Sequence, residues 1–168
     1  RSPSRGLGDV YKRQAITGSA GKTSVKDLTG FCLDKLDKTY YSKNSFNNKY
    51  GVPLSIINSP QSTKFSVLEV GMDKKGEIDT LTKLIKPNLG LITNISYAHI
   101  KNFKNLDEIA KAKGEIINNI SPSGAMIINK DDKYCNYFIS KAKMRNLNII
   151  TFSKKNKLAD VVYLGERK

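Results

Sequence analysis

Residues 15–23 read Ala-Ile-Thr-Gly-Ser-Ala-Gly-Lys-Thr, and this stretch decides which fold the chain is expected to adopt. A short strand leads into a glycine-rich turn, and a helical pattern begins at Lys22. Glycines let a backbone turn tightly enough for its N–H groups to surround a phosphate, and the start of a helix adds a positive dipole end. Lys22 would then reach the β- and γ-phosphates of a nucleotide, and the Thr23 hydroxyl would bind Mg²⁺.

The loop is a shortened form of the common phosphate-binding pattern. That pattern has a glycine five places before the second glycine of the loop, where this chain has Ile16. An ordinary glycine turn that caps a helix is the alternative. The order of strand, Gly18, Gly-Lys-Thr and helix favours phosphate binding. The candidate nucleotide contacts are the loop residues and the first helical turn: Gly18, Ser19, Ala20, Gly21, Lys22, Thr23 and Ser24.

Beyond the loop, short apolar runs alternate with amphipathic stretches. The expected strands are Ala15–Thr17, Thr39–Ser42, Phe65–Val70, Leu89–Ile95, Ala125–Asn129, Asn148–Phe152 and Asp160–Leu164. The expected helices are Lys22–Leu36, Val52–Asn58, Glu77–Ile85, Leu106–Ile120 and Asp132–Arg145. Alternation of this kind predicts an α/β fold with a mainly parallel, doubly wound sheet, in which ligands bind beyond the carboxyl ends of the strands.

The first fourteen residues, Arg1–Gln14, follow neither a helical nor a strand pattern. We interpret them as a non-native tail derived from adapter sequence and exclude them from the fold. A native basic tail is the alternative. Residues 15–168 would then form one domain.

The formal net charge of +14 raises the question of nucleic-acid binding. The cations are spread along the chain and are nearly all lysine, since only Arg145 and Arg167 follow residue 14. This removes the arginine forks that usually read bases, so we expect no nucleic-acid partner. No apolar run approaches the length of a membrane span. Cys32 and Cys135 are far apart, suit a reducing cytoplasm and are predicted to be small core residues.

Two ionisable side chains follow strands on the expected ligand side. Glu69 lies near the end of an apolar strand, where burial of a carboxylate requires a cation. That cation would be Mg²⁺ or, alternatively, a lysine. His99 lies just beyond the next strand, after Asn94, and is the only histidine. A lone histidine is more often structural than a ligand, although its position favours function.

Lys113 is singled out by its place on the helix Leu106–Ile120. It lies four residues after Ile109 and three before Ile116, so it falls within the apolar stripe. Asn105 followed by Glu108 fits the start of this helix and fixes its register. A lysine within such a stripe needs a partner or a function, unless its stem reaches the edge of the protein.

Taken together, the motifs of this chain resemble those of a known family. The strings TGSAGKTSVKDLT, SFNNKYGVP, LEVGMDKKGEID, LITNISYAHIKNF, EIAKAKGEI and MIINKDD follow one another in the order found in Mur ligases, from Ala15 to Lys168. The resemblance implies the central ATP-binding domain of such a ligase, with amino- and carboxyl-terminal domains absent. We expect this chain alone to bind nucleotide weakly and to lack ligase activity.

The resemblance also implies roles for single residues. Lys22 and Thr23 would hold ATP and the first Mg²⁺ beside Glu69, and His99 would serve a second Mg²⁺. Lys113 matches the family lysine that can carry a carbamate, an anionic metal ligand. The catalytic set is thus Lys22, Lys113, His99 and Asn48, and the metal ligands are Thr23, Glu69, His99 and Lys113. Asn47 and Asn48 match the substrate loop, and Asn129 matches the residue that contacts adenine.

The implied reaction joins D-Ala-D-Ala to UDP-N-acetylmuramoyl-tripeptide through an acyl phosphate. This places the enzyme in peptidoglycan synthesis in the cytoplasm, as a monomer in its full-length form, with ATP and Mg²⁺ as cofactors. One alternative is a sister ligase, either the one that adds the third peptide residue or a folylpolyglutamate synthetase. Another is a P-loop nucleotide-binding module without ligase activity.

Overall fold

The structure is a computed structural model, and it describes residues 12–42, 44–97 and 102–165. His99, one of the predicted site residues, lies outside the described residues. The elements are β1 (Lys12–Thr17), α1 (Lys22–Asp34), β2 (Thr39–Tyr41), α2 (Gly51–Asn58), β3 (Phe65–Glu69), α3 (Glu77–Ile85), β4 (Leu89–Ile92), α4 (Leu106–Lys113), the 3₁₀ helix η2 (Gly114–Asn119), β5 (Ala125–Asn129), α5 (Cys135–Lys143), β6 (Asn148–Ser153) and β7 (Val161–Val162).

The predicted parallel sheet is confirmed. Its seven described strands follow the order β2-β3-β1-β4-β5-β6-β7, and every neighbouring pair is parallel. On β1 and β3 consecutive residues such as Ala15, Ile16, Val67 and Leu68 are buried, as expected for central strands covered on both faces. The chain leaves β1 towards β2 on one side and later places β4 on the other. The loop after β1 therefore lies where the strand order reverses, which is the usual position of a ligand.

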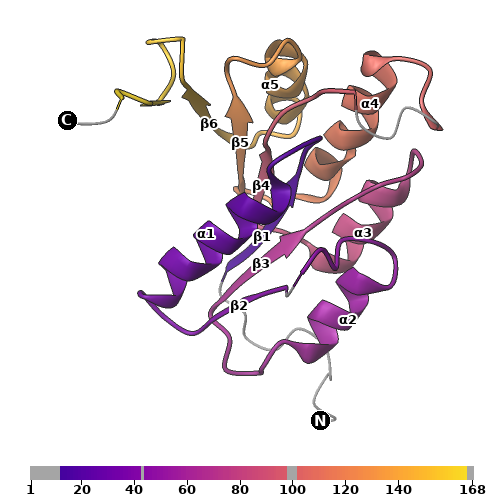
Figure 1. The fold of residues 1–168 in the computed structure, drawn as a ribbon, viewed down its shortest axis with the longest axis vertical. Helices are drawn as coiled ribbons and strands as arrows, with labels where there is room; N and C mark the ends of the chain where they lie inside the picture. Colours follow the sequence, from indigo (N-terminus) through magenta and orange to yellow (C-terminus); the bar gives the residue numbers. More distant parts are fainter. Residues whose placement is uncertain (1–11, 43, 98–101, 166–168) are drawn as a thin grey trace.

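Helices flank both faces, but unequally. α1 packs on β1, β2 and β3 by itself, and it lies across β1 and β3 in Figure 1. On the opposite face α2 contacts α3, α3 contacts η2, and η2 contacts α5. This distribution follows from right-handed crossovers, because the chain moves in one direction from β1 to β2 and in the other direction afterwards. Most of the apolar core lies between the sheet and these later helices.

Two expected elements end three or more residues early. The helix expected over Leu106–Ile120 is α-helical only to Lys113, and the residues from Gly114 continue as the 3₁₀ helix η2. Gly114 stands at this break, where an added Cβ would lie 3.2 Å from the Tyr137 ring, so the close packing favours glycine at this position. β4 ends at Ile92 instead of Ile95, since the residues that follow turn towards the loop after β1.

Two expected starts also differ by three residues. β1 begins at Lys12, three residues before the expected strand, because Lys12–Gln14 pair with Phe65–Val67 of β3. The end of the excluded segment at Gln14 therefore does not coincide with the start of the sheet. The last helix begins at Cys135 instead of Asp132, whose carboxylate accepts the Tyr134 N–H.

The two cysteines differ in their exposure to solvent. Cys135 is buried, as predicted for both, whereas Cys32 is exposed on α1, so the prediction for Cys32 was wrong. α1 packs only one of its sides on the sheet, and Cys32 lies outside that side. Within the described ranges, none of the helices combines the length and the apolar character that a membrane crossing requires.

Candidate active site

The loop between β1 and α1 has the backbone conformation that its glycines predict. Gly18 has φ 147°, and a Cβ there would lie 1.8 Å from Thr93 Oγ1. Gly21 precedes the first residue of α1 with φ 78°, in the left-handed region. Only glycine adopts these conformations without strain, and a side chain at Gly18 would also collide with Thr93, the residue after β4. The loop is therefore built around Gly18 and Gly21, as the sequence indicated.

The end of β4 holds this loop in place. The Ser19 N–H donates to the Asn94 carbonyl oxygen at 2.9 Å, and the Ala20 N–H donates to Asn94 Oδ1 at 3.1 Å. Thr93 Oγ1 donates to the Ala20 carbonyl oxygen at 2.6 Å. These contacts join two segments that are distant in sequence and fix the cradle before any ligand arrives. Preorganisation of this kind lowers the entropic cost of binding.

Glu69 is a buried carboxylate beside the start of α1. It is 1% exposed, and its two oxygens accept hydrogen bonds from Thr23 Oγ1 and from Asn47 Nδ2, both at 2.7 Å. In the described part of the chain no lysine forms a salt bridge with it. The lysine partner considered as an alternative is therefore not observed, and Glu69 instead offers oxygen atoms next to the Thr23 hydroxyl. Hard cations such as Mg²⁺ prefer ligands of this kind.

Lys113 is the most unusual lysine of the site. It is 1% exposed, and its Nζ donates to the Gly18 carbonyl oxygen at 2.9 Å. Its stem therefore does not reach the edge of the protein, which was the alternative to a functional role. Burial, together with the nearby charge of Lys22, lowers the pKa of Lys113 from 10.5 to about 7. A large share of the amine is then neutral, and so nucleophilic, at neutral pH.

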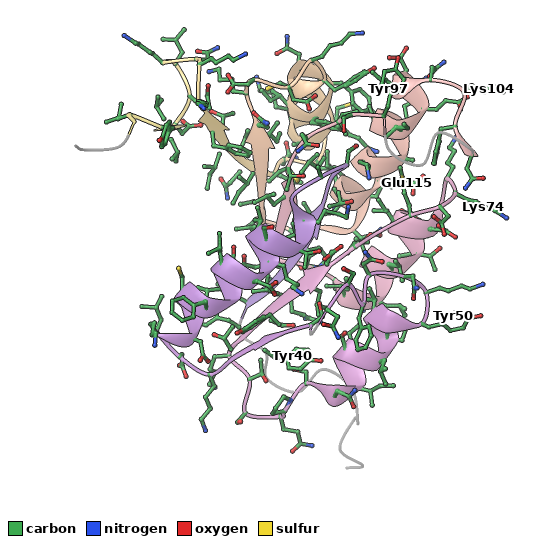
Figure 2. The ribbon with its side chains drawn as sticks, in the orientation of Figure 1. Tyr40, Tyr50, Lys74, Tyr97, Lys104 and Glu115 are labelled. Carbon is green, nitrogen blue, oxygen red and sulfur yellow. The ribbon has the colours of Figure 1, made fainter. Side chains whose placement is uncertain are left out.

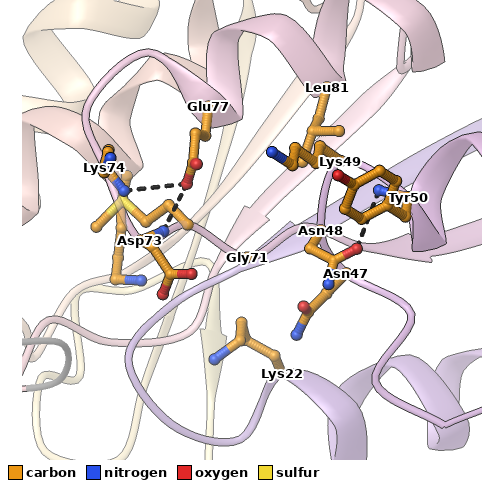
Figure 3. A pocket seen from close by; sticks show the side chains of 12 residues that line it. Lys22, Asn47, Asn48, Lys49, Tyr50, Gly71, Asp73, Lys74, Glu77 and Leu81 are labelled. Atoms are coloured by element: carbon orange, nitrogen blue, oxygen red, sulfur yellow. Dashed lines mark hydrogen bonds between the residues drawn. The ribbon is translucent and has the colours of Figure 1, made fainter.

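A cavity of ≈ 420 Å³ joins these groups (Figure 3). It is lined by Lys22, Asn47, Asn48, Lys49, Tyr50, Gly71, Met72, Asp73, Lys74, Glu77, Leu81 and Lys113. Asn48 Oδ1 accepts the N–H groups of Tyr50 and Gly51 at the start of α2, which leaves the Asn48 amide nitrogen as the donor for a ligand. The cavity thus places Lys22, Lys113 and the asparagine pair Asn47 and Asn48 around one space.

The remaining predicted residues lie around this centre. Asn129 is at the end of β5, outside the lining of the cavity, and its Nδ2 donates to the Thr93 carbonyl oxygen at 3.0 Å. Its Oδ1 accepts the Asp131 N–H. Ser24 is exposed on the first turn of α1. The structure thus brings Lys22, Thr23, Glu69 and Lys113 close to the same loop, and their chemical roles remain predictions.

Lys26 was missed at the sequence level although a signal was present. It is fully buried, and its Nζ donates to the carbonyl oxygens of Ser42 and Asn44 at 2.5 and 2.8 Å. Lys26 lies four residues after Lys22 and four before the buried Gly30, so it falls on the inner side of α1. Its helical neighbours Lys22, Thr23 and Gly30 form no apolar stripe like the one around Lys113, so only its spacing from Gly30 pointed inward. Lys26 anchors the loop that leads to Asn47.

Comparison with known proteins gives the class of this chain. Residues 16–165 match the profile of the family described as the Mur ligase middle domain. The chain belongs to this family, and the seven-stranded parallel sheet with its glycine-rich loop is consistent with that.

Particular relatives can then be named. The UDP-N-acetylmuramoyl-tripeptide--D-alanyl-D-alanine ligase of Borreliella burgdorferi is 41% identical over 140 residues, which cover 83% of this chain and 30% of the relative. The ligase of the same name from Escherichia coli is 37% identical over 118 residues, which cover 70% of this chain and 26% of the relative. The matched part of the chain thus spans between a quarter and a third of the length of these relatives.

Solved structures give the same result. A crystal structure of MurF from Acinetobacter baumannii superposes with a TM-score of 0.84 at 33% identity, covering 90% of this chain and 32% of that chain. MurF from Thermotoga maritima, solved in complex with ADP, superposes with a TM-score of 0.74 at 26% identity, covering 86% of this chain and 33% of that chain.

Proposed function

We propose that this chain is the nucleotide-binding domain of an ATP-dependent ligase that adds D-Ala-D-Ala to UDP-N-acetylmuramoyl-tripeptide. The observation that carries the proposal is the single cavity lined by Lys22, Lys113, Asn47 and Asn48 beside the Glu69–Thr23 pair. Relatives that are 41% and 40% identical to this chain bear the name of this reaction. We further propose that the enzyme acts in the cytoplasm as a monomer.

The loop and Lys22 would bind the phosphates of ATP. The backbone N–H groups of the loop and the start of α1 provide partial positive charge, and Lys22 adds a full charge at the edge of the cavity. The relative from Thermotoga maritima was solved with ADP, which supports nucleotide binding at this fold. Asn129, at the end of β5, would contact the adenine, as the family resemblance implies.

The oxygen-rich surroundings of Thr23 fit Mg²⁺. Thr23 Oγ1 and the Glu69 carboxylate lie 2.7 Å apart next to the phosphate loop, so they would hold the ion between them, directly or through water. Bound Mg²⁺ would neutralise negative charge on the transferred phosphoryl group. Lys113, whose pKa is about 7, is suited to carbamate formation, in which its neutral nitrogen bonds to CO₂ and loses a proton. His99 is proposed as a contributor to a second metal site.

The reaction would then proceed in two steps. First, the terminal carboxylate of the tripeptide attacks the γ-phosphorus of ATP, and ADP leaves. The amine of D-Ala-D-Ala next attacks the acyl phosphate carbon, loses a proton and expels phosphate. Lys22 would hold the phosphates in line, and the amide groups of Asn47 and Asn48 would orient the acceptor peptide. Holding the two reactants together supplies much of the rate enhancement in such reactions.

Nucleotide binding to this chain is the first test. Isothermal titration calorimetry should detect Mg-ATP, with affinity reduced at least about tenfold in Lys22→Ala, because a charge-assisted phosphate contact is lost. Lys35→Ala, an exposed lysine on the same helix, is the matched control. Binding of nucleic acid that falls steeply with salt, together with indifference to Mg-ATP, would contradict the proposal.

Ligase activity is the second test. The coding sequence of this chain, expressed together with its flanking genomic sequence, should release phosphate only when ATP, the UDP-linked tripeptide and D-Ala-D-Ala are all present. Release that requires a free amino acid or glutamate in place of D-Ala-D-Ala would instead assign a sister ligase. Lys113→Ala in this protein should abolish release.

A further inference from the structure

Glu115 has no role in the proposed function, although it lies in the Gly114-Glu115-Ile116 string that the sequence singled out. Its side chain is buried, and Figure 2 places it on the side of the sheet where α3 and α4 lie. Oε1 accepts the Gly76 N–H at 2.8 Å, and Oε2 accepts the N–H groups of Gly76 and Asp79 at 3.0 and 3.2 Å. Both carboxylate oxygens are therefore occupied by backbone donors of another element.

These donors belong to the start of α3. The residue before the helix is Gly76, with φ 91°, and it has no side chain to cap the free N–H groups of the first turn. Such groups need an acceptor, and a carboxylate near a helix start is favoured by the helix dipole. Glu115 supplies this cap from η2, a segment 39 residues away from Gly76.

The segment that Glu115 caps is also a wall of the catalytic cavity. Asp73, Lys74 and Glu77 line that cavity. Glu77 Oε2 accepts the N–H groups of Asp73 and Lys74 at 2.6 and 3.0 Å, as the dashed lines in Figure 3 show. Hydrogen bonds to Glu77 thus hold this wall segment together, and hydrogen bonds to Glu115 attach it to η2.

Glu115 lies only two residues after Lys113, at the junction of α4 and η2. Lys113 donates to the Gly18 carbonyl oxygen in the phosphate loop, whereas Glu115 accepts from Gly76. The backbone changes from α to 3₁₀ geometry at Gly114, between Lys113 and Glu115. Gly114 itself is packed tightly against Tyr137 and Phe138. A 3₁₀ stretch often continues an α-helix at its C-terminal end, as η2 does here.

We propose that Glu115 is a positioning residue that sets Lys113 against the phosphate loop by fixing the α4–η2 junction to the start of α3. The inference rests on the proposed function for the role of Lys113 and deepens it. A simple ion pair of Glu115 with Lys141, which lines a neighbouring cavity with it, is not the explanation, because no such pair forms within the described ranges.

The test uses nuclear magnetic resonance of the isotope-labelled chain without nucleotide. Four proteins are compared: the unaltered chain, Glu115→Ala, Glu115→Gln and Asp160→Asn. Asp160 is the matched control, because its carboxylate also accepts a backbone N–H, that of Thr151 at 2.7 Å, but near β7. Amide hydrogen exchange at Gly76 and Asp79 reports the cap, and the signals of Gly18–Lys22 report the Lys113 contact.

In Glu115→Ala we expect exchange at Gly76 and Asp79 to accelerate at least about tenfold, because hydrogen bonds to a charged acceptor are lost. The signals of Gly18–Lys22 should shift in the same variant. Glu115→Gln retains one acceptor oxygen and should restore most of both readouts, whereas Asp160→Asn should leave both unchanged. Faster exchange at Gly76 and Asp79 without a shift of the Gly18–Lys22 signals would show that Glu115 only caps α3 and does not position Lys113. No change in either readout would overturn the proposal altogether.

Nucleotide binding separates this inference from the proposed function. If the unaltered chain binds Mg-ATP, Glu115→Ala should weaken that binding about tenfold, as loss of a residue that orients a ligand usually does. Unchanged binding would contradict the inference. If the unaltered chain does not bind Mg-ATP, the proposed function fails, while the exchange and signal measurements still decide whether Glu115 positions Lys113.

Discussion

Lys113 Nζ donates a hydrogen bond to the carbonyl oxygen of Gly18 at 2.9 Å, although the two residues are 95 positions apart. This contact joins α4 to the phosphate loop and brings a second ammonium group close to Lys22. An interior site with like charge nearby disfavours the protonated amine. Burial of the charged Lys113 amine beside the cavity therefore destabilises the fold.

Lys113→Met should stabilise the chain at low pH. The pKa of Lys113 is about 7 in the folded state against an ordinary 10.5, so the unfolded state binds more protons between these values and unfolding free energy rises with pH there. Below pH 7 the full burial penalty applies. The variant should then exceed the unaltered chain by on the order of 2 kcal/mol, and the difference should shrink by pH 10. Urea unfolding at several pH values, in bicarbonate-free buffer, measures it.

Gly18→Ala should destabilise the fold by about 3 kcal/mol, because a Cβ meets Thr93 Oγ1 at 1.8 Å and the backbone has φ 147°. Gly21→Ala is the matched control in the same loop. Gly21 also has positive φ, at 78°, but a Cβ there has no neighbour within 4 Å, so only about 1 kcal/mol is expected. Thermal unfolding compares the two, and equal losses would show that the close approach to β4 is not the cause.

Lys26→Met should destabilise the fold by about 3 kcal/mol. The substitution leaves the Ser42 and Asn44 carbonyl oxygens without their charged donor in a buried place. Lys35→Met at the C-cap of the same helix should change stability by less than about 0.5 kcal/mol, since the Lys35 side chain is exposed and lies over the face of Phe31. Chemical unfolding of both variants measures the contrast. A similar small loss in both would mean that Lys26 does not anchor the loop.

Cys32 should react with a thiol reagent at pH 8 at least about a hundred times faster than Cys135. Cys32 is exposed, whereas Cys135 is 6% exposed and burial raises the pKa of its thiol above the ordinary value. The reaction of the folded chain with Ellman's reagent should therefore show one fast and one slow thiol. In concentrated urea both should react rapidly, and two fast thiols in the folded chain would contradict the packing around α5.

Much of the fold could be predicted because its elements have local signals. The capping pair Asn105 and Glu108 predicted the start of α4, and the structure shows the Glu108 N–H donating to Asn105 Oδ1 at 3.0 Å. The apolar stripe placed Lys113 in the interior, and the residue is 1% exposed. The glycines predicted a tight turn between β1 and α1, and Gly18 and Gly21 form it with positive φ.

Other features had no local signal. The helix break at Gly114 lies against Tyr137 and Phe138 of α5, and the periodic pattern of the segment continues through it. Glu115 could not be assigned, because its partners Gly76 and Asp79 are backbone groups of another element. The lysine alternative for Glu69 stayed open until the structure showed Thr23 and Asn47 as its partners.

The sequence by itself determined the order of strands and helices, the phosphate loop and the interior position of Lys113, because periodicity and glycine chemistry act over a few neighbouring residues. The tertiary structure alone decided which of these parts meet. Crossovers of the sheet bring the ends of β1, β3 and β4 to one edge. There Lys113 donates a hydrogen bond to the Gly18 carbonyl oxygen, Thr23 donates one to Glu69, and the Ala20 N–H donates one to Asn94. Contacts between distant segments arise only when the chain has folded, since hydrogen-bond partners such as Gly18 and Lys113 share no local pattern.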